Sequence, residues 1–181
     1  MNPHRYAAVL LSLALASAAS AQSPFWKDQN GKPAAETASM KSRDGFGGSI
    51  LLTSDADWKQ KWDTPAESSP NFTVASKVGA GRKVSLLMFF SNAKPDAAGN
   101  IKVLCDITLI DPKGAASLIK KDAVCFDGQI SGSPHNIYLS RPTIDLSFNP
   151  TDAHGTWAFQ VNLRDAVRKV SLPLRTSFEL K

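Results

Sequence analysis

Histidine, cysteine and long apolar runs are all scarce in this 181-residue chain, and each scarcity excludes a class of functional site or of protein. The three histidines and two cysteines form neither an H-E-x-x-H motif nor a closely spaced ligand set, so we expect no metal and no cofactor. No nucleophile elbow accompanies the histidines, and we predict no catalytic residue. Past residue 21 the longest uninterrupted hydrophobic run is Leu86–Phe90, far shorter than the about 20 residues of a transmembrane helix.

A strong excess of one charge is also missing. The chain has 21 Lys and Arg against 16 Asp and Glu, a formal net charge of +5. Its basic residues are scattered near acids or turns, whereas nucleic-acid binders gather them on one face with stacking aromatics. We therefore expect no nucleic-acid partner, although the charge allows weak attraction to acidic glycans or lipopolysaccharide.

Residues 1–21 have the features of a signal peptide. A short basic start with His4 and Arg5 precedes an apolar run, and Ala19-x-Ala21 is a small-residue cleavage site. We therefore expect cleavage after Ala21 and a periplasmic or secreted protein. Because such compartments are oxidising, we predict a disulfide between the two cysteines, Cys105 and Cys125.

The remainder of the chain has the size of one domain. Residues 22–46 are polar with few, irregularly spaced apolar side chains, and we interpret them as a flexible leader whose Phe25–Trp26 pair can dock on the domain. Residues 47–181 should form a single domain that is large enough to build its own core.

From residue 72 onward the apolar residues recur with a period of two, which is typical of strands. About seven to nine strands are separated by turn residues, and no long helical period interrupts them. This pattern predicts an all-β, antiparallel sandwich. The expected strands are 47–53, 84–90, 101–109, 117–126, 136–140, 143–148, 157–164 and 170–180.

One short helix is expected near residues 54–63. Ser54 can cap its free amides, and Asp55 and Asp57 would lie at the positive end of the helix dipole. Trp58 and Trp62 are four residues apart and therefore share one face. They form either a lid over the open end of the sandwich or a partly exposed aromatic platform for a ligand or partner.

The two cysteines do not face each other in a simple hairpin. Asp111-Pro112-Lys113-Gly114 is a type I turn signal, which would place a residue near 120 opposite Cys105. Cys125 is displaced from that position by about five residues. We expect either a bulge in the second strand or a crossing of its last part to another strand.

Possible metal ligands have simpler structural interpretations. Met88 lies within Leu-Leu-Met-Phe-Phe, where a core role is expected before a copper site shared with Met40 and His135. Asp152 and His154 fit a loop in which the aspartate bonds its own backbone. We predict no metal site from these residues.

Two stretches resemble strands of immunoglobulin-like and macroglobulin-type domains. In Gly155–Asp165 a glycine and an aromatic residue begin a strand of alternating apolar residues, and Ile107–Gly114 resembles the strand and turn of such domains. The resemblance extends over residues 101–180. It implies an immunoglobulin-like sandwich and carries no activity with it.

The function expected from these observations is binding. Asp106 and Asp145 form no evident catalytic pair, and we predict a non-catalytic protein that binds another macromolecule, a protein or another component of the cell envelope. The alternative is a glycan or small-ligand binding module that uses Trp58, Trp62 and Trp26. An enzyme with an unrecognised site is the third class.

Overall fold

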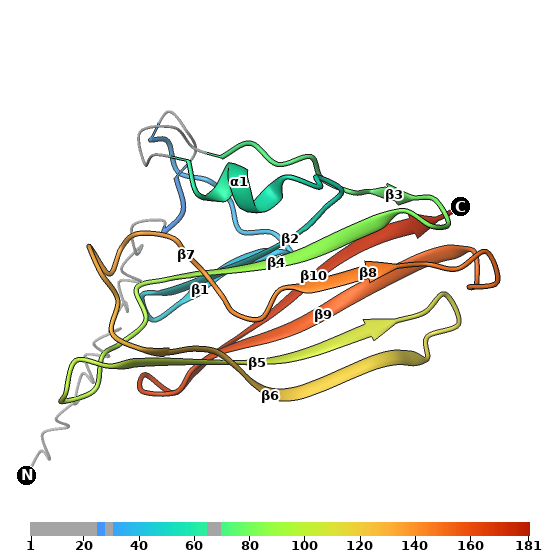
Figure 1. The fold of residues 1–181 in the computed structure, drawn as a ribbon. Helices are drawn as coiled ribbons and strands as arrows, with labels where there is room; N and C mark the ends of the chain where they lie inside the picture. Colours follow the sequence, from blue (N-terminus) through green and yellow to red (C-terminus); the bar gives the residue numbers. More distant parts are fainter. Residues whose placement is uncertain (1–24, 28–30, 65–69) are drawn as a thin grey trace, which may run out of the picture.

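A computed structural model describes residues 25–27, 31–64 and 70–181 of the chain, which form two β-sheets and one short helix (Figure 1). The predicted signal peptide lies outside these residues. The elements are β1 (Met40–Arg43), β2 (Phe46–Thr53), α1 (Trp58–Trp62), β3 (Lys77–Val78), β4 (Lys83–Ser91), β5 (Ile101–Ile110), β6 (Ala116–Gly128), β7 (Tyr138–Leu139), β8 (Ile144–Ser147), β9 (Gly155–Asp165) and β10 (Val170–Leu180).

The two sheets have five strands each. Sheet 1 has the order β1-β2-β4, and β7 and β8 pair with successive parts of the free edge of β4. Sheet 2 has the order β3-β10-β9-β5-β6. Every strand pair is antiparallel except β3 and β10, which run parallel. The predicted all-β sandwich with one short helix is therefore confirmed, with more strands than expected.

The core lies between the sheets because each strand sends alternate apolar side chains inward. Phe90 from β4 and Phe159 and Leu163 from β9 are among its fully buried side chains. Gly48 of β2 lies where the sheets approach closely, since a Cβ added there would be 2.7 Å from Leu163 Cδ2. A larger side chain at this position would push the sheets apart.

The outer face of sheet 1 is covered by a second apolar layer. The outward-facing Leu87 and Phe89 of β4 are buried, at 0% and 7% exposure. The rings of Trp62 and Phe72 lie over Phe89, with centroid distances of 5.2 Å and 6.3 Å. The helix α1 therefore covers a face of sheet 1 and not the open end of the sandwich that we expected for a lid (Figure 1).

The expected leader contributes a strand. Within residues 31–46, β1 pairs with β2 through a two-residue hairpin at Asp44-Gly45, both with positive φ (50° and 80°). Asp-Gly is a strong signal for such a turn, so residues 40–46 belong to the fold. Before them, Trp26 is 8% exposed, and the Phe25 ring occupies the space that a side chain at Gly47 would need.

Cys105 and Cys125 form the predicted disulfide, with 5.9 Å between their Cα atoms and both residues fully buried. Cys105 lies opposite Ala123 and Leu104 opposite Val124, but Val103 lies opposite Phe126, so the register shifts by one residue between Leu104 and Val103. Cys125 is the extra residue at that shift, which confirms a bulge in β6. The bulge turns Cys125 inward and lets the bond form.

The start of α1 differs from the expectation. The residue before the helix is Asp57 and not Ser54, and its side chain makes no capping hydrogen bond. Asp55 instead pairs with Lys61 Nζ at 2.9 Å and accepts a hydrogen bond from the Thr73 N–H at 2.8 Å. These contacts fasten the helix to the loop before β3, and they hold the pKa of Asp55 at about 2.

Candidate functional site

The outer face of sheet 2 is open, unlike that of sheet 1. In the described part of the chain no element packs over it (Figure 1), and its outward side chains are mostly polar. They come from the three central strands, since alternate residues of each strand point to the same side. The polar positions include Asp106 and Thr108 of β5, Gln160, Asn162 and Arg164 of β9, and Ser171, Arg175 and Ser177 of β10.

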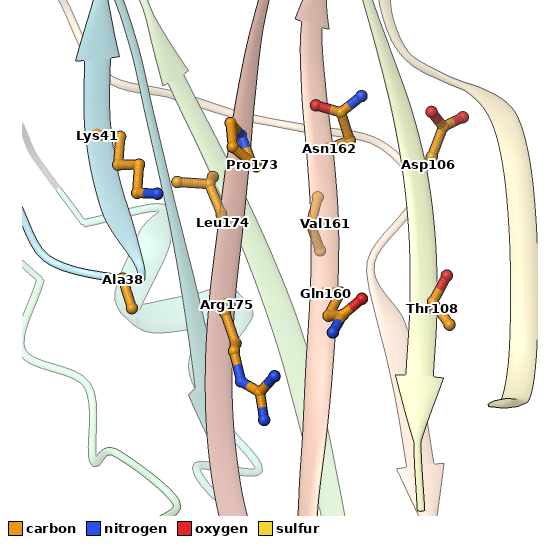
Figure 2. Close-up of a pocket in the computed structure, with 10 residues that line it drawn as sticks. All are labelled: Ala38, Lys41, Asp106, Thr108, Gln160, Val161, Asn162, Pro173, Leu174 and Arg175. Carbon is orange, nitrogen blue, oxygen red and sulfur yellow. The ribbon is translucent and has the colours of Figure 1, made fainter. Parts of the chain in front are cut away.

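A groove of about 460 Å³ crosses this face. The strand register places its side chains in two rows, Asp106–Asn162–Pro173 and Thr108–Gln160–Arg175. Figure 2 shows these rows on three neighbouring strands, with Ala38 and Lys41 beside β10. The volume lies within the range of small-ligand sites.

The wall beside β10 is built by the chain around β1. The Arg175 N–H donates a hydrogen bond to the Ala38 carbonyl at 2.7 Å, which holds this segment of sheet 1 against the edge of sheet 2. Lys41, half-buried, and Arg175, exposed, therefore lie on the same side of the groove. Neither cation forms an ion pair with a carboxylate among the described residues.

The opposite end of the groove carries a fixed carboxylate. Asp106 Oδ1 accepts hydrogen bonds from Arg164 Nη2 at 3.1 Å and from the Asp122 N–H at 2.9 Å. Arg164 Nη2 also bonds Asp122 Oδ1 at 2.5 Å, and this bond, with the charges of both aspartates, raises the pKa of the guanidinium above its ordinary value. The groove thus has two cations without an ion-pair partner in the described chain at one end, amides in the middle, and at the other end a carboxylate that shares the charge of Arg164 with Asp122.

The predicted aromatic surface lies on the other side of the molecule. Trp58 and Trp62 are half-buried on α1 over sheet 1, and Trp62 packs on Phe89. Trp26 is buried, and its ring contacts that of Phe25, which lies against Gly47 of β2 in the same sheet. The structure therefore places the tryptophans away from the groove, and Trp58 makes no ring contact with another described residue.

The other residues considered for chemistry are dispersed. His135 and His154 are both exposed; His135 lies in the loop before β7 and His154 in the loop between β8 and β9. Asp145 of β8 pairs with Lys83 and accepts a hydrogen bond from Ser85, which lowers its pKa, and it lies on the other sheet from Asp106. Among the residues that the structure describes, no group of three His, Cys, Asp or Glu could hold a metal ion.

Sequence reasoning did not find the groove. The polar positions 160, 162 and 164 were visible as one face of a strand, but their neighbours depend on the strand order. Lys41 fell in the expected leader, and Arg175 gave no signal of its own. In β9 and in β10 polar residues alternate with apolar ones, and this shared alternation is the pattern that could have indicated a polar face.

Comparisons with known proteins find only weak structural likenesses. No family model matches the chain, and no curated protein matches it. An alkylpurine DNA glycosylase of Pseudomonas fluorescens is 15% identical with a TM-score of 0.39, and the match covers 59% of this chain. A family 123 glycoside hydrolase of Clostridium perfringens is 11% identical with a TM-score of 0.45, over 75% of this chain.

This chain spans only 28% and 27% of the lengths of those two proteins. The CARDB domain of a Pyrococcus furiosus protein is covered over 99% of its length and 82% of this chain, with 7% identity and a TM-score of 0.40. These likenesses are weak and diverse, and with TM-scores below 0.5 they carry no argument about the fold or the function of this chain. No helix in the described residues is long and apolar enough to span a membrane.

Proposed function

We propose that this protein is exported to the periplasm or secreted and that, without catalysing a reaction, it binds another macromolecule, a protein or another component of the cell envelope. The proposal rests on the contrast between the two outer faces. One face of the sandwich is covered by its own chain, whereas the other presents Asp, Asn, Gln and Arg side chains around a groove. Export is supported by the Cys105–Cys125 disulfide, since such bonds persist in oxidising compartments.

The arrangement of the groove favours recognition over catalysis. A general acid and base need two titratable groups that face one reacting centre. Here the carboxylate of Asp106 is already engaged by Arg164 and by a backbone N–H. Gln160 and Asn162, which lie between Asp106 and the cations, are suited to hydrogen bonding with a bound partner.

The test is capture of partners from the native cell envelope by the exported protein and two variants. Gln160→Tyr fills the groove on sheet 2, while Ser147→Tyr adds the same ring at an exposed position of β8 in sheet 1. We expect Gln160→Tyr to lose a specific partner that the wild type and Ser147→Tyr retain. Equal capture by both variants would refute this face as the binding surface. Enzymatic turnover that a single histidine or carboxylate substitution abolishes would refute the non-catalytic function.

A glycan or small ligand that stacks on α1 is the second candidate function. It is favoured by Trp58, which is half-buried and has no ring partner in the described chain. Sugar rings stack on such aromatic faces. Trp58→Phe should then weaken glycan binding and reduce the fluorescence that an aqueous quencher removes. A Trp58 emission that is insensitive to quencher would exclude an exposed platform.

A further inference from the structure

The groove on sheet 2 has a charge pattern that selects among macromolecular ligands. Lys41 and Arg175 border it on the side of β1 and β10, and neither has a carboxylate partner in the described chain. Their positive charges are therefore available to an anionic group. Charge-assisted hydrogen bonds to such a group are roughly twice as strong as neutral ones.

The opposite side of the groove disfavours a polyanion that has closely spaced charges and no hydroxyls. Asp106 lies in the same row as Pro173 but two strands away. Two strand spacings amount to about 10 Å. The Asp106 carboxylate would repel a second closely spaced anion, but its remaining oxygen can accept a hydrogen bond from a hydroxyl. Arg164 and the Asp122 N–H hold that carboxylate in position for such a contact.

The middle of the groove favours neutral groups that both donate and accept. Gln160 and Asn162 supply amide N–H donors and carbonyl acceptors, and Thr108 supplies a hydroxyl. A ligand that matches the whole groove thus carries an anionic group at one end and hydroxyls along the rest. Sugar acids and sulfated sugars have this combination, whereas polyphosphate and the DNA backbone present charges without free hydroxyls along the chain.

We infer that this groove binds an acidic polysaccharide, with the carboxylate or sulfate of one sugar at Lys41 and Arg175. The amides and Asp106 then hold the hydroxyls of that sugar and its neighbour. This inference rests on the proposed function, because it names the class of macromolecule that the same face binds.

The experiment measures binding of the exported protein to four immobilised polymers at about 0.15 M salt, where long-range attraction is screened. Polygalacturonate offers carboxylates, dextran sulfate offers sulfates, dextran is neutral, and polyphosphate is a polyanion without sugar. The test variant is Lys41→Gln/Arg175→Gln. Its matched control is Lys59→Gln/Arg82→Gln, which removes the same charge from exposed residues outside the groove.

We expect at least one acidic polysaccharide to bind more tightly than dextran and polyphosphate, and the one that binds identifies the anionic group. Lys41→Gln/Arg175→Gln should weaken it by at least about tenfold, since one charge-assisted hydrogen bond is worth that much. Gln160→Ala should also weaken binding of the polysaccharide. Unfolding temperatures of all variants show whether each remains folded.

Two results would overturn the inference: polyphosphate that binds as tightly as the polysaccharides, or the same loss of affinity in the control Lys59→Gln/Arg82→Gln. If no acidic polysaccharide binds while Gln160→Tyr still abolishes capture of an envelope protein, the inference fails and the proposed function stands. If neither kind of partner depends on the groove, both fail.

Discussion

Replacement of Gly48 by alanine tests the close approach of the two sheets. The added Cβ would lie 2.7 Å from Leu163 Cδ2 and 3.0 Å from Leu172 Cδ1, where ordinary contacts begin at 3.4 Å. Both leucines are buried, at 0% and 1% exposure, and Leu163 would have to shift by about 0.7 Å. Overpacking of this kind costs about 1–3 kcal/mol, and the lower entropy of the unfolded alanine chain offsets roughly 0.4–1 kcal/mol of it.

The expected net loss is about 1–2 kcal/mol in the free energy of unfolding, measured by urea denaturation. A domain of this size should then melt roughly 2–8 °C lower. Gly79→Ala is the matched control, because its Cβ would meet only Arg82 Cγ at an ordinary 3.6 Å. Leu163→Val should recover part of the loss in the Gly48→Ala background. A Gly48→Ala protein as stable as Gly79→Ala would refute the packing of the sheets described above.

Three further predictions concern the disulfide and two ion-pair clusters. Cys105→Ala/Cys125→Ala should lower the free energy of unfolding by about 3 kcal/mol, from the 20-residue separation, while partner binding at low temperature persists; two free thiols in the native exported protein would contradict the bond. Because the pKa of Asp55 falls from 3.8 to about 2 on folding, its contribution is complete above pH 4 and is lost as the pH falls from about 4 to 2. The stability difference between wild type and Asp55→Asn should therefore shrink over that window, and a difference that is constant with pH would exclude the ion pair as its source. Arg164→Gln leaves two aspartates without their cation and should lower the free energy of unfolding by about 1 kcal/mol, measured by thermal unfolding. An unchanged free energy would show that the cluster is not stabilising.

The sandwich was predictable where side-chain period alone determines the fold. Phe90 of β4 and Phe159 of β9 are in the core, on the apolar faces that alternation identified. The displacement of Cys125 was also predictable, because a disulfide requires two close Cα atoms and the hairpin register did not supply them; the sequence left a bulge and a crossing to another strand open, and the structure has the bulge.

The remaining features depend on backbone geometry and on contacts between distant segments. β1 has one apolar residue, Met40, and is held by backbone pairing to β2, so its sequence has no alternation of apolar and polar residues that would indicate a strand. The Asp44-Gly45 turn was the overlooked indication. The groove was beyond prediction because Lys41 and Arg175 belong to different sheets and become neighbours only where the segment of Ala38 bonds to β10.

The hydrogen bond between Ala38 and Arg175 has a consequence for how the protein is made. A ribosome or a secretion channel delivers the chain from the N-terminus, so β1 emerges long before β10. The β10 strand pairs with both β9 and β3 and also supports Ala38, so the sandwich cannot close until this late strand arrives. Such non-local pairing places folding among the slow, high-contact-order cases, on a scale of roughly milliseconds to seconds. Until then β1 and β2 expose apolar residues to water, and a chaperone that holds the nascent N-terminal hairpin would be of most use in that interval.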